Sequence, residues 1–295
     1  MQASVTKSIR NYVEVTKPPI VSLLVFTSVA AMVVAWIKTL QAFNIWLFVE
    51  AVFAITAASA GCDVLTSYID RDIDAVMHRT KHRPIPSGRI KAKRALVWGF
   101  LLSAIGLTLA FWINSLAFLW IGLGVVDNVI IYSLLLKRRS PWNIVLGGIS
   151  GGLPVMFGWS AVTGTVSLLP VLLASLVVLW IPGHIWSLAI FTKDDYERAR
   201  VPMLPVMTKL STALRCIVST VALMVPFSLW IFFVGKFGLI YLVVAVIFGT
   251  AVLYVNFELF VHPDDKIAYK AFKISSPYLF TLFLSMIVDS LLHIL

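Results

Sequence analysis

Residues 68–94 read YIDRDIDAVMHRTKHRPIPSGRIKAKR, and this charged stretch directly follows a long apolar run. Asp70 and Asp74 are four residues apart, so on a helix both carboxylates would project from one face. Such a pair can bind a hard cation such as Mg²⁺. Eight Lys and Arg follow Asp70 within the stretch, and cations at this density can grip the phosphates that the metal bridges. The stretch therefore predicts a metal-diphosphate site at a membrane surface.

The composition around this stretch is that of a polytopic membrane protein. Of the 295 residues, 60% are hydrophobic and 13% are charged, and the mean hydropathy is +0.93. A soluble domain of this size does not have such a composition. Nine apolar runs each approach the ~20 residues that a helix needs to cross a bilayer. We therefore expect an all-α protein with one integral membrane domain over residues 1–295. The expected spans are 19–38, 45–68, 95–113, 116–136, 142–163, 168–191, 212–234, 239–260 and 275–295.

The formal charge of +10 is distributed unevenly along this pattern of spans. The N-terminal segment and the loops after the even-numbered spans hold 22 of the 24 Lys and Arg, and the other side holds only Lys38 and Lys236. By the positive-inside rule the N-terminus is cytoplasmic, the C-terminus is outside, and the charged site faces the cytoplasm. This distribution argues against a nucleic-acid partner. We expect a multi-pass protein of a prokaryotic plasma membrane.

Asp63 is an acidic residue inside an expected span, where charge is costly and usually functional. At about 100° per residue, three other polar side chains fall within about 60° of its face: Ser67, Asp70 and Asp74. Thr66 lies at the edge of this face, whereas Asp72 points to the opposite side and is expected to be solvated or ion-paired. Asp63 either lines a cavity or forms a hydrogen bond with a neighbouring helix.

A second charged loop follows the sixth span and resembles the first. It contains both acidic and basic residues, namely Lys193, Asp194, Asp195, Glu197 and Arg198. Two such loops four spans apart suggest two halves that face a shared cavity. The prolines of PIPSG (84–88) and VPMLP (201–205) should end helices there and turn the chain back toward the bilayer.

His184 is the histidine that lies well inside the apolar body, in LWIPGHIWSLAIF (179–191). Pro182 and Gly183 precede it and can loosen the helix. A histidine in this position is either a hydrogen-bonded helix contact or a contact to a ligand or substrate. The sequence leaves both interpretations open.

Over nearly its whole length the chain resembles the UbiA superfamily of intramembrane prenyltransferases. The aspartate motif in residues 68–89 is typical of the superfamily. LKRRSPWNIVLGGISGGLP (136–154), together with His184 and DYERARVPMLP (195–205), resembles the branch that farnesylates heme. YVEVTKPPI (12–20) belongs to the same resemblance. The resemblance implies a nine-helix bundle around a central cavity, capped on the cytoplasmic side by the charged loops.

The resemblance also implies a set of metal-binding residues. The first family motif, Asn-x-x-x-Asp-x-x-x-Asp, corresponds to Thr66, Asp70 and Asp74, and a threonine hydroxyl is a weaker metal ligand than an amide carbonyl. The second motif corresponds to Asp195 and Tyr196, with Asp194 as an additional acid. Its partner position four residues on is Ala199, so a second metal ion would have fewer protein ligands.

The activity that the resemblance implies is Mg²⁺-dependent farnesyl transfer from farnesyl diphosphate to a vinyl group of heme b, giving heme O and diphosphate. Asp70, Asp74 and Asp195 would be the catalytic carboxylates. They would bind Mg²⁺, with Asp194 as a further ligand. The expected diphosphate-binding residues are Thr66, Arg79, Arg83, Lys137, Arg138, Lys193 and Arg198. The expected acceptor-side residues are His184, Tyr196 and Asp63. Further expected partners are the lipid bilayer and a downstream heme-modifying enzyme or a terminal oxidase assembly.

Three other functions fit parts of the sequence. A related prenyltransferase could act on an aromatic acid or a glyceryl phosphate lipid, which the aspartate motif fits equally well and the heme-branch segments do not. A secondary transporter would have two halves and polar midplane residues, but the paired Asp and the Lys and Arg lie at the interface. A heme-binding chaperone would explain His184 but not the two aspartates.

Overall fold

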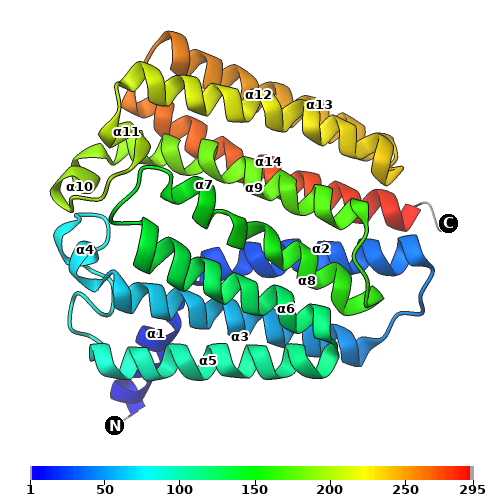
Figure 1. Cartoon of the computed structure of the whole chain (residues 1–295), viewed down its shortest axis with the longest axis horizontal. Coiled ribbons are helices and arrows are strands. Elements are labelled where there is room, and N and C mark those ends of the chain that lie inside the picture. The colour runs from blue at the N-terminus through cyan, green and yellow to red at the C-terminus, as the bar shows by residue number, and fades with distance from the viewer. Residues whose placement is uncertain (1, 293–295) are drawn as a thin grey trace.

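The structure, a computed structural model, describes residues 2–292, and the regular elements within this range are all helices (Figure 1). Nine spans in this range are long and apolar enough to cross a membrane. They are α2 (Pro18–Thr39), α3 (Ile45–Ile69), α5 (Ala92–Ile113), α6 with η1 (Ser115–Leu136), α7 with α8 (Asn143–Thr163), α9 (Leu168–Phe191), α12 (Leu210–Gly235), α13 (Leu239–Val261) and α14 (Asp265–Leu292). The chain is therefore a multi-pass membrane protein, as the composition predicts.

The ninth span differs most from the expectation. The helix α14 begins at Asp265, ten residues before the predicted start at 275. Its first turn is polar, and the Asp264 side chain accepts hydrogen bonds from the amides of Lys266 and Ile267 at 2.7 and 3.3 Å. Hydropathy marks where the apolar part of a helix starts, whereas this capped helix starts earlier, in its polar segment. The predicted end at 293–295 lies outside the described residues.

The long helices lie side by side, and the short helices gather at one end of the bundle (Figure 1). These are α4 (Arg71–Val76), α10 (Lys193–Arg198) and α11 (Leu204–Met207). We call this end, formed by residues 70–91, 137–142 and 192–209, the cap end. The helix α1 (Gln2–Glu14) also lies there. At the opposite end, the Lys38 ammonium donates to the carbonyl of Lys236 at 3.0 Å.

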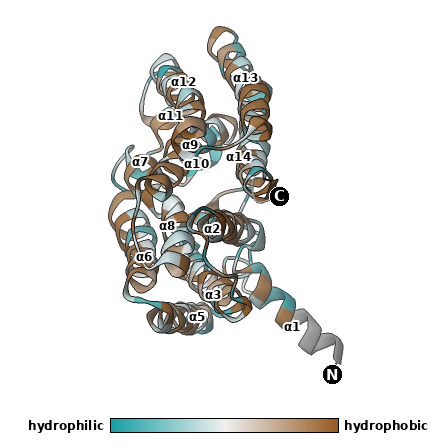
Figure 2. Cartoon of the chain, turned by 90° about the vertical axis from the view of Figure 1, so that its right-hand side faces the viewer, coloured by the Kyte–Doolittle hydropathy of each residue, from teal (hydrophilic) through white to brown (hydrophobic). Residues whose placement is uncertain are grey.

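Small residues allow the helices to approach closely. A Cβ atom added to Gly106 in α5 would lie 2.6 Å from the backbone nitrogen of Ala58 in α3. Close packing of small residues is how helices associate where lipid supplies no hydrophobic driving force. Hydrophobic residues also cover the outer faces of the bundle, as expected for contact with lipid (Figure 2).

The fourth span changes its helical type halfway. After α6 (Ser115–Val125), the segment η1 (Val126–Leu136) is a π-helix, and the Lys137 amide donates to the carbonyl of Tyr132 at 2.8 Å. Asp127 accepts from the Ser150 amide at 2.8 Å and so ties η1 to α8 (Ile149–Thr163). π-helical segments are rare and often occur at functional sites. This one ends directly before Lys137 and brings that residue to the end of α3.

The loop after α4 packs onto α1 and the neighbouring helices. A small cluster of buried apolar residues holds it, namely Val15, Val64, Ile85, Ile90 and Ala95. Arg89 also forms a two-pronged ion pair with Glu14 and donates to Asn11 at 3.0 Å. The loop is thus fixed to α1 both by apolar contacts and by charge.

Candidate active site

Asp70 lies at the junction of α3 and α4 and is 4% exposed. One carboxylate oxygen accepts from the Lys137 ammonium at 2.5 Å, and the other is buried and has no hydrogen-bond partner among the described residues. A buried carboxylate oxygen without a partner is unfavourable. Burial alone would lower the pKa of Lys137, but the facing Tyr132 and Asp70 outweigh burial and raise that pKa. Asp70 thus offers one oxygen that a cation could bind.

Asp74 lies one turn further, in α4, and is equally buried. Its amide donates to the Asp70 carbonyl at 2.8 Å, so the predicted helical relation of the two residues is confirmed. One nitrogen of the Arg83 guanidinium contacts both carboxylate oxygens, at 3.1 and 2.9 Å. Asp72 instead pairs with Arg138 on the exposed side, as predicted, and the hydrogen bond from Arg138 lowers the pKa of Asp72 to about 2.

Lys17 is a site residue that the sequence analysis missed. Its ammonium lies 3.1 Å from a carboxylate oxygen of Asp63 and 3.2 Å from the Thr66 hydroxyl. Its backbone is left-handed, with φ of 52°, which is uncommon for a residue with a side chain and is often retained at functional sites. The signal was a lysine directly before Pro18, where α2 begins. Thr66, the predicted weak ligand, also donates to the Asp63 carbonyl at 3.1 Å.

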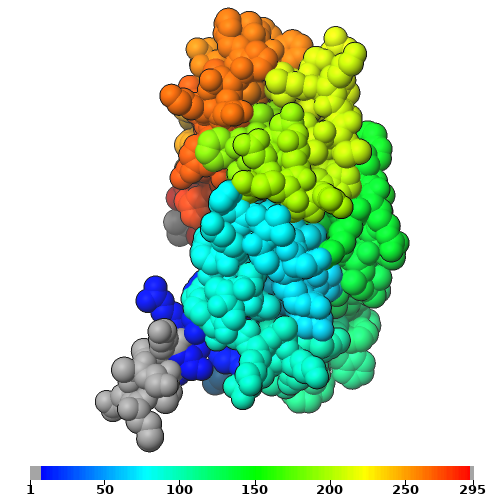
Figure 3. Space-filling view, turned by 90° about the vertical axis from the view of Figure 1, so that its left-hand side faces the viewer, coloured from blue at the N-terminus to red at the C-terminus, as the bar shows by residue number. Residues whose placement is uncertain are grey.

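The second charged loop meets the first at Asp195. Its carboxylate accepts hydrogen bonds from the amides of His78 and Arg79, at 2.9 and 3.0 Å, and from Arg198 at 2.5 Å. Burial would raise the pKa of Asp195, but these donors outweigh burial and the pKa is lowered. The cap end shows the same meeting of the two loops: the cyan segment near residues 70–94 lies against the yellow-green segment near 192–209 (Figure 3). The two loops are thus in contact, and the cavity that they were expected to share stays a prediction.

The three predicted catalytic carboxylates have different partners in the structure: Asp70 and Asp74 pair with Lys137 and Arg83, whereas Asp195 accepts from two backbone amides and from Arg198. Within residues 2–292, no three His, Cys, Asp or Glu side chains lie close enough to hold a metal ion. The two carboxylate oxygens of Asp195 each accept a hydrogen bond from a backbone amide of the first loop. The assignment of Asp70, Asp74, Asp195 and Asp194 as metal ligands stays a prediction.

The other predicted diphosphate-binding residues lie further out on the cap end. Arg138 donates to Asp72 and to the Ile69 carbonyl, and Lys193 lies 3.5 Å from Glu197. Asp194, the predicted additional acid, is exposed and borders a surface depression of about 470 Å³ together with Lys193, Asp195 and Arg198. The Arg79 side chain is also exposed. Of the predicted cations, Arg83 and Lys137 are the two that contact Asp74 and Asp70.

The predicted acceptor-side residues occupy three separate environments. His184 lies 2.6 Å from the Ser275 hydroxyl and stacks between Trp180 and Phe272 at ring distances of 4.2 and 4.4 Å, so its described contacts are those of a helix contact. Tyr196 is buried in an apolar cluster below the second loop. Asp63 lines the central cavity and also accepts a hydrogen bond from Lys17 at the start of the neighbouring helix α2, so it combines its two predicted roles.

The central cavity is narrow. It lies between α2, α3, α6, η1 and α8, and its walls are mostly apolar. Its volume of about 60 Å³ corresponds to roughly two water molecules at ~30 Å³ each. A long isoprenoid chain would therefore enter only if side chains or helices moved apart.

Comparison with known proteins places this chain in a family. Residues 24–286 match the UbiA prenyltransferase family. The chain is 53% identical to a protoheme IX farnesyltransferase of Desulforudis audaxviator, over 95% of this chain and 88% of that one. It is 43% identical to a protoheme IX farnesyltransferase of Thermoplasma volcanium, over 95% and 97% of the two chains.

Two solved structures share the fold. A digeranylgeranylglyceryl phosphate synthase superposes with a TM-score of 0.77 at 22% identity, covering 96% of this chain and 98% of that one. A UbiA homolog from Archaeoglobus fulgidus, solved with DMAPP and Mg²⁺, superposes with a TM-score of 0.69 at 17% identity, covering 94% and 99%. At these identities the likeness shows the fold alone.

Proposed function

Because the chain belongs to the UbiA prenyltransferase family, it is a prenyltransferase, and we propose that it transfers the farnesyl group of farnesyl diphosphate to a vinyl group of heme b. The products are heme O and diphosphate. The relatives named as protoheme IX farnesyltransferases match over 95% of the chain and support heme as the acceptor.

The observation that carries the diphosphate side of the proposal is the environment of Asp70. This carboxylate is buried beside Lys137, has one oxygen without a partner, and lies one turn from Asp74 with its Arg83. The donor set of two carboxylates suits Mg²⁺, which takes one or two protein carboxylates together with substrate phosphates. Asp70 and Asp74 would hold the ion, which would act as a Lewis acid on the diphosphate and stabilise the charge of the leaving group.

The cations of the site would act on the same leaving group. Lys137 and Arg83 now each neutralise a carboxylate, and both can turn to the diphosphate oxygens as negative charge develops there. The Asp195 clamp supports them from outside, because it holds the loop on which Arg79 and Arg83 lie. Holding the loop in place keeps these cations close to the position of the leaving group.

The farnesyl chain would occupy the apolar cavity that Asp63 borders, after the side chains or helices around it move apart. Loss of diphosphate breaks the allylic C–O bond, and the terminal vinyl carbon of heme b donates its electron pair to form the new C–C bond. Water then adds its oxygen to the inner vinyl carbon and releases a proton, which leaves the hydroxyethylfarnesyl group. The narrow, mostly apolar cavity would keep water from the cation until the vinyl group attacks.

The test is an assay of the purified protein in detergent with heme b, farnesyl diphosphate and Mg²⁺, followed by mass spectrometry of the extracted heme. We expect a mass gain of one farnesyl group plus a hydroxyl, and its loss on addition of a chelator. If no heme product forms but diphosphate is released when an aromatic acid or a glyceryl phosphate lipid is supplied, the protein is still a prenyltransferase and its acceptor is that compound instead of heme. A heme product that forms equally well with chelator would overturn the role of the metal.

A further inference from the structure

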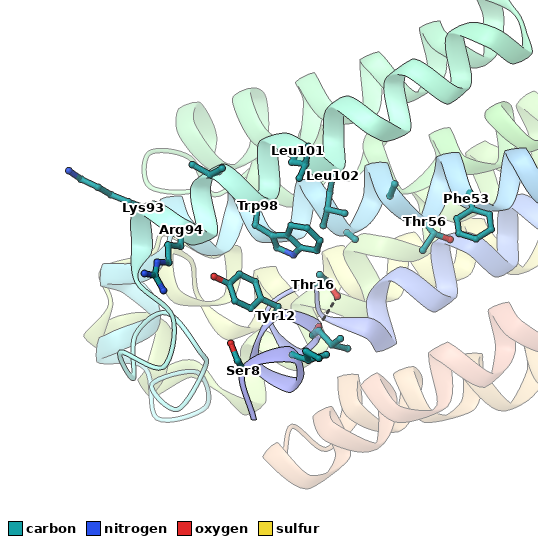
Figure 4. Close-up of a pocket in the computed structure, with 15 residues that line it drawn as sticks. Ser8, Tyr12, Thr16, Phe53, Thr56, Lys93, Arg94, Trp98, Leu101 and Leu102 are labelled. Carbon is teal, nitrogen blue, oxygen red and sulfur yellow. Dashed lines mark hydrogen bonds between the residues drawn. The ribbon is translucent and has the colours of Figure 1, made fainter. Parts of the chain in front are cut away.

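A second, much larger cavity lies outside the site. It is a groove of about 920 Å³ between α1, α3 and α5, and it does not include any residue of the carboxylate site (Figure 4). Its walls are almost wholly apolar and include side chains that are well exposed, with Phe53 at 66%, Val97 at 67% and Leu101 at 50%. In a multi-pass membrane protein, exposed apolar side chains along a spanning helix face the lipid. The groove therefore opens sideways into the bilayer.

The charged mouth of the groove lies at the cap end. Lys93 and Arg94, in the first turn of α5, line it and are exposed (Figure 4). Neither forms an ion pair with a carboxylate in the part of the chain that the structure describes. From Lys93 to Leu102 the groove follows α5 for about 13 Å at 1.5 Å per residue. This length is close to the depth of one leaflet, about half of the ~30 Å hydrocarbon core.

The wall of the groove contains an aromatic pair. Tyr12 of α1 meets Trp98 of α5 edge to face, with ring centroids 5.9 Å apart and an interplanar angle of 82°. The indole N–H of Trp98 is buried and has no hydrogen-bond acceptor among the described residues. Tyr and Trp are enriched at the depth where lipid headgroups meet acyl chains. The groove thus combines an apolar floor, an interfacial aromatic pair and two cations at one end.

We propose that this groove binds one anionic phospholipid, with an acyl chain along α5 and the headgroup phosphate held by Lys93 and Arg94. The arrangement follows the two parts of such a lipid: apolar surface at acyl-chain depth and positive charge at headgroup depth. Lys and Arg near a membrane surface attract anionic lipid, so we expect the two together to select an anionic over a zwitterionic headgroup by more than about tenfold.

The bound lipid would also brace the active site, an inference that rests on the proposed function. One wall of the groove is formed by α1 and by Thr16, two residues beyond its end, and the next residue, Lys17, holds Asp63. On the other side of α1, Glu14 forms the ion pair with Arg89 of the cap loop. A lipid packed against α1 therefore stabilises both contacts, and we expect anionic lipid to raise the turnover of the enzyme.

Native mass spectrometry of the full-length protein tests the binding directly. The protein is mixed with equal amounts of phosphatidylglycerol and phosphatidylcholine, and the retained lipid is counted. We expect wild type to retain one phosphatidylglycerol in preference to phosphatidylcholine. The double variant K93Q/R94Q should lose this preference by about tenfold or more. The control variant K209Q/K266Q should retain phosphatidylglycerol as wild type does. The control residues are exposed basic residues near the same end but outside the groove. A57W, which fills the groove floor and leaves both cations in place, should also lose the retained lipid.

Three results would overturn the proposal. The first is that wild type and K93Q/R94Q retain phosphatidylglycerol equally, and the second is that wild type retains the two lipids equally. The third is that K93Q/R94Q selectively loses bound heme b instead of lipid. Activity in nanodiscs provides a separate measurement. Phosphatidylglycerol should stimulate wild type and K209Q/K266Q but not K93Q/R94Q. Absence of heme farnesylation in every lipid would instead contradict the proposed function, because lipid retention is measured without turnover.

Discussion

Each buried carboxylate near the end of α3 is matched to one cation that comes from a different element. The pairs are Asp63 with Lys17, Asp70 with Lys137, and Asp74 with Arg83. Buried charges are costly unless they are paired, and removing one member leaves the other charge uncompensated. Substitution of either partner should therefore disturb the site more than its position in a loop suggests.

Replacing Asp70 by Asn should reduce kcat for heme farnesylation by at least about a hundredfold. The reason is that the amide keeps the shape of the side chain but removes the negative charge that would bind Mg²⁺, and loss of one strong electrostatic contact at a reacting centre costs about 10²–10³-fold. Steady-state kinetics with heme b and saturating farnesyl diphosphate measure this effect.

The matched control is Asp72→Asn, two residues away. Asp72 is exposed and pairs with Arg138 at the surface, and such pairs are worth about 0–1 kcal/mol. Its turnover should stay within about fivefold of wild type. Equal turnover of D70N and wild type would contradict the assignment of Asp70.

Replacing Lys17 by Met should lower the free energy of unfolding by about 3 kcal/mol, the range found when a buried ion pair loses one partner. Asp63 would then keep its buried charge without the ammonium, at 7% exposure. Adding Asp63→Asn to K17M should restore part of the loss, because the stranded charge is removed. Equilibrium unfolding in mixed micelles gives the four values of this double-mutant cycle, and additive losses would show that the two residues are not coupled.

The contact between the two cap loops is a property of elements rather than of one residue. Asp195 in α10 accepts hydrogen bonds from two consecutive amides of the loop after α4. Four membrane spans separate the two loops in the sequence. Changing Asp195 to Asn removes the charge-assisted hydrogen bonds, at a cost of about 1–3 kcal/mol. Amide exchange at His78 and Arg79 should accelerate by about five- to a hundredfold, since 1.4 kcal/mol is a factor of about ten. Hydrogen–deuterium exchange mass spectrometry measures it.

Glu197→Gln is the control for that clamp, because Glu197 lies in the same helix but forms a half-exposed pair with Lys193. In the E197Q variant, the amides of His78 and Arg79 should exchange at the same rate as in wild type. If D195N and E197Q exchanged alike, Asp195 would not hold the first loop.

The same clamp predicts a pH dependence. The pKa of Asp195 is lowered in the folded protein, so its stabilisation is fully present above the unfolded value of about 3.9. It is lost as the pH falls through the lower folded value. Protection of the His78 and Arg79 amides, corrected for intrinsic exchange, should therefore be constant from about pH 7 to 5 and decrease only below about pH 4. A decrease already at pH 6 would point to a different titrating group.

For the whole molecule, charge separates the two ends of the bundle. The cap end carries nearly all Lys and Arg, and the other end carries Lys38 and Lys236, which contact each other. We predict that the cap end is cytoplasmic. In a C62S/C216S background, Gln41→Cys at the far end should react with an impermeant maleimide added outside spheroplasts, and Lys81→Cys should react only after lysis. The reverse labelling would invert the topology.

The sequence by itself determined the number and order of the spans and the acidic motif that names the family. Spans are readable because each must bury its backbone in lipid with its own apolar residues, which makes the signal local. The i,i+4 spacing of Asp70 and Asp74 is local in the same way. Asp72 could likewise be assigned to the exposed face, since helical angle alone decides it.

Only the tertiary structure decided which charges meet. Lys17 reaches Asp63 because a left-handed residue turns the chain into α2, and Lys137 reaches Asp70 because a π-helical segment precedes it. Asp195 holds the first loop because backbone amides far away in the sequence donate to its oxygens. The groove between α1, α3 and α5 likewise exists only because these three helices pack side by side. Contacts between residues far apart in the chain depend on helix packing and backbone turns, and no local spacing records them.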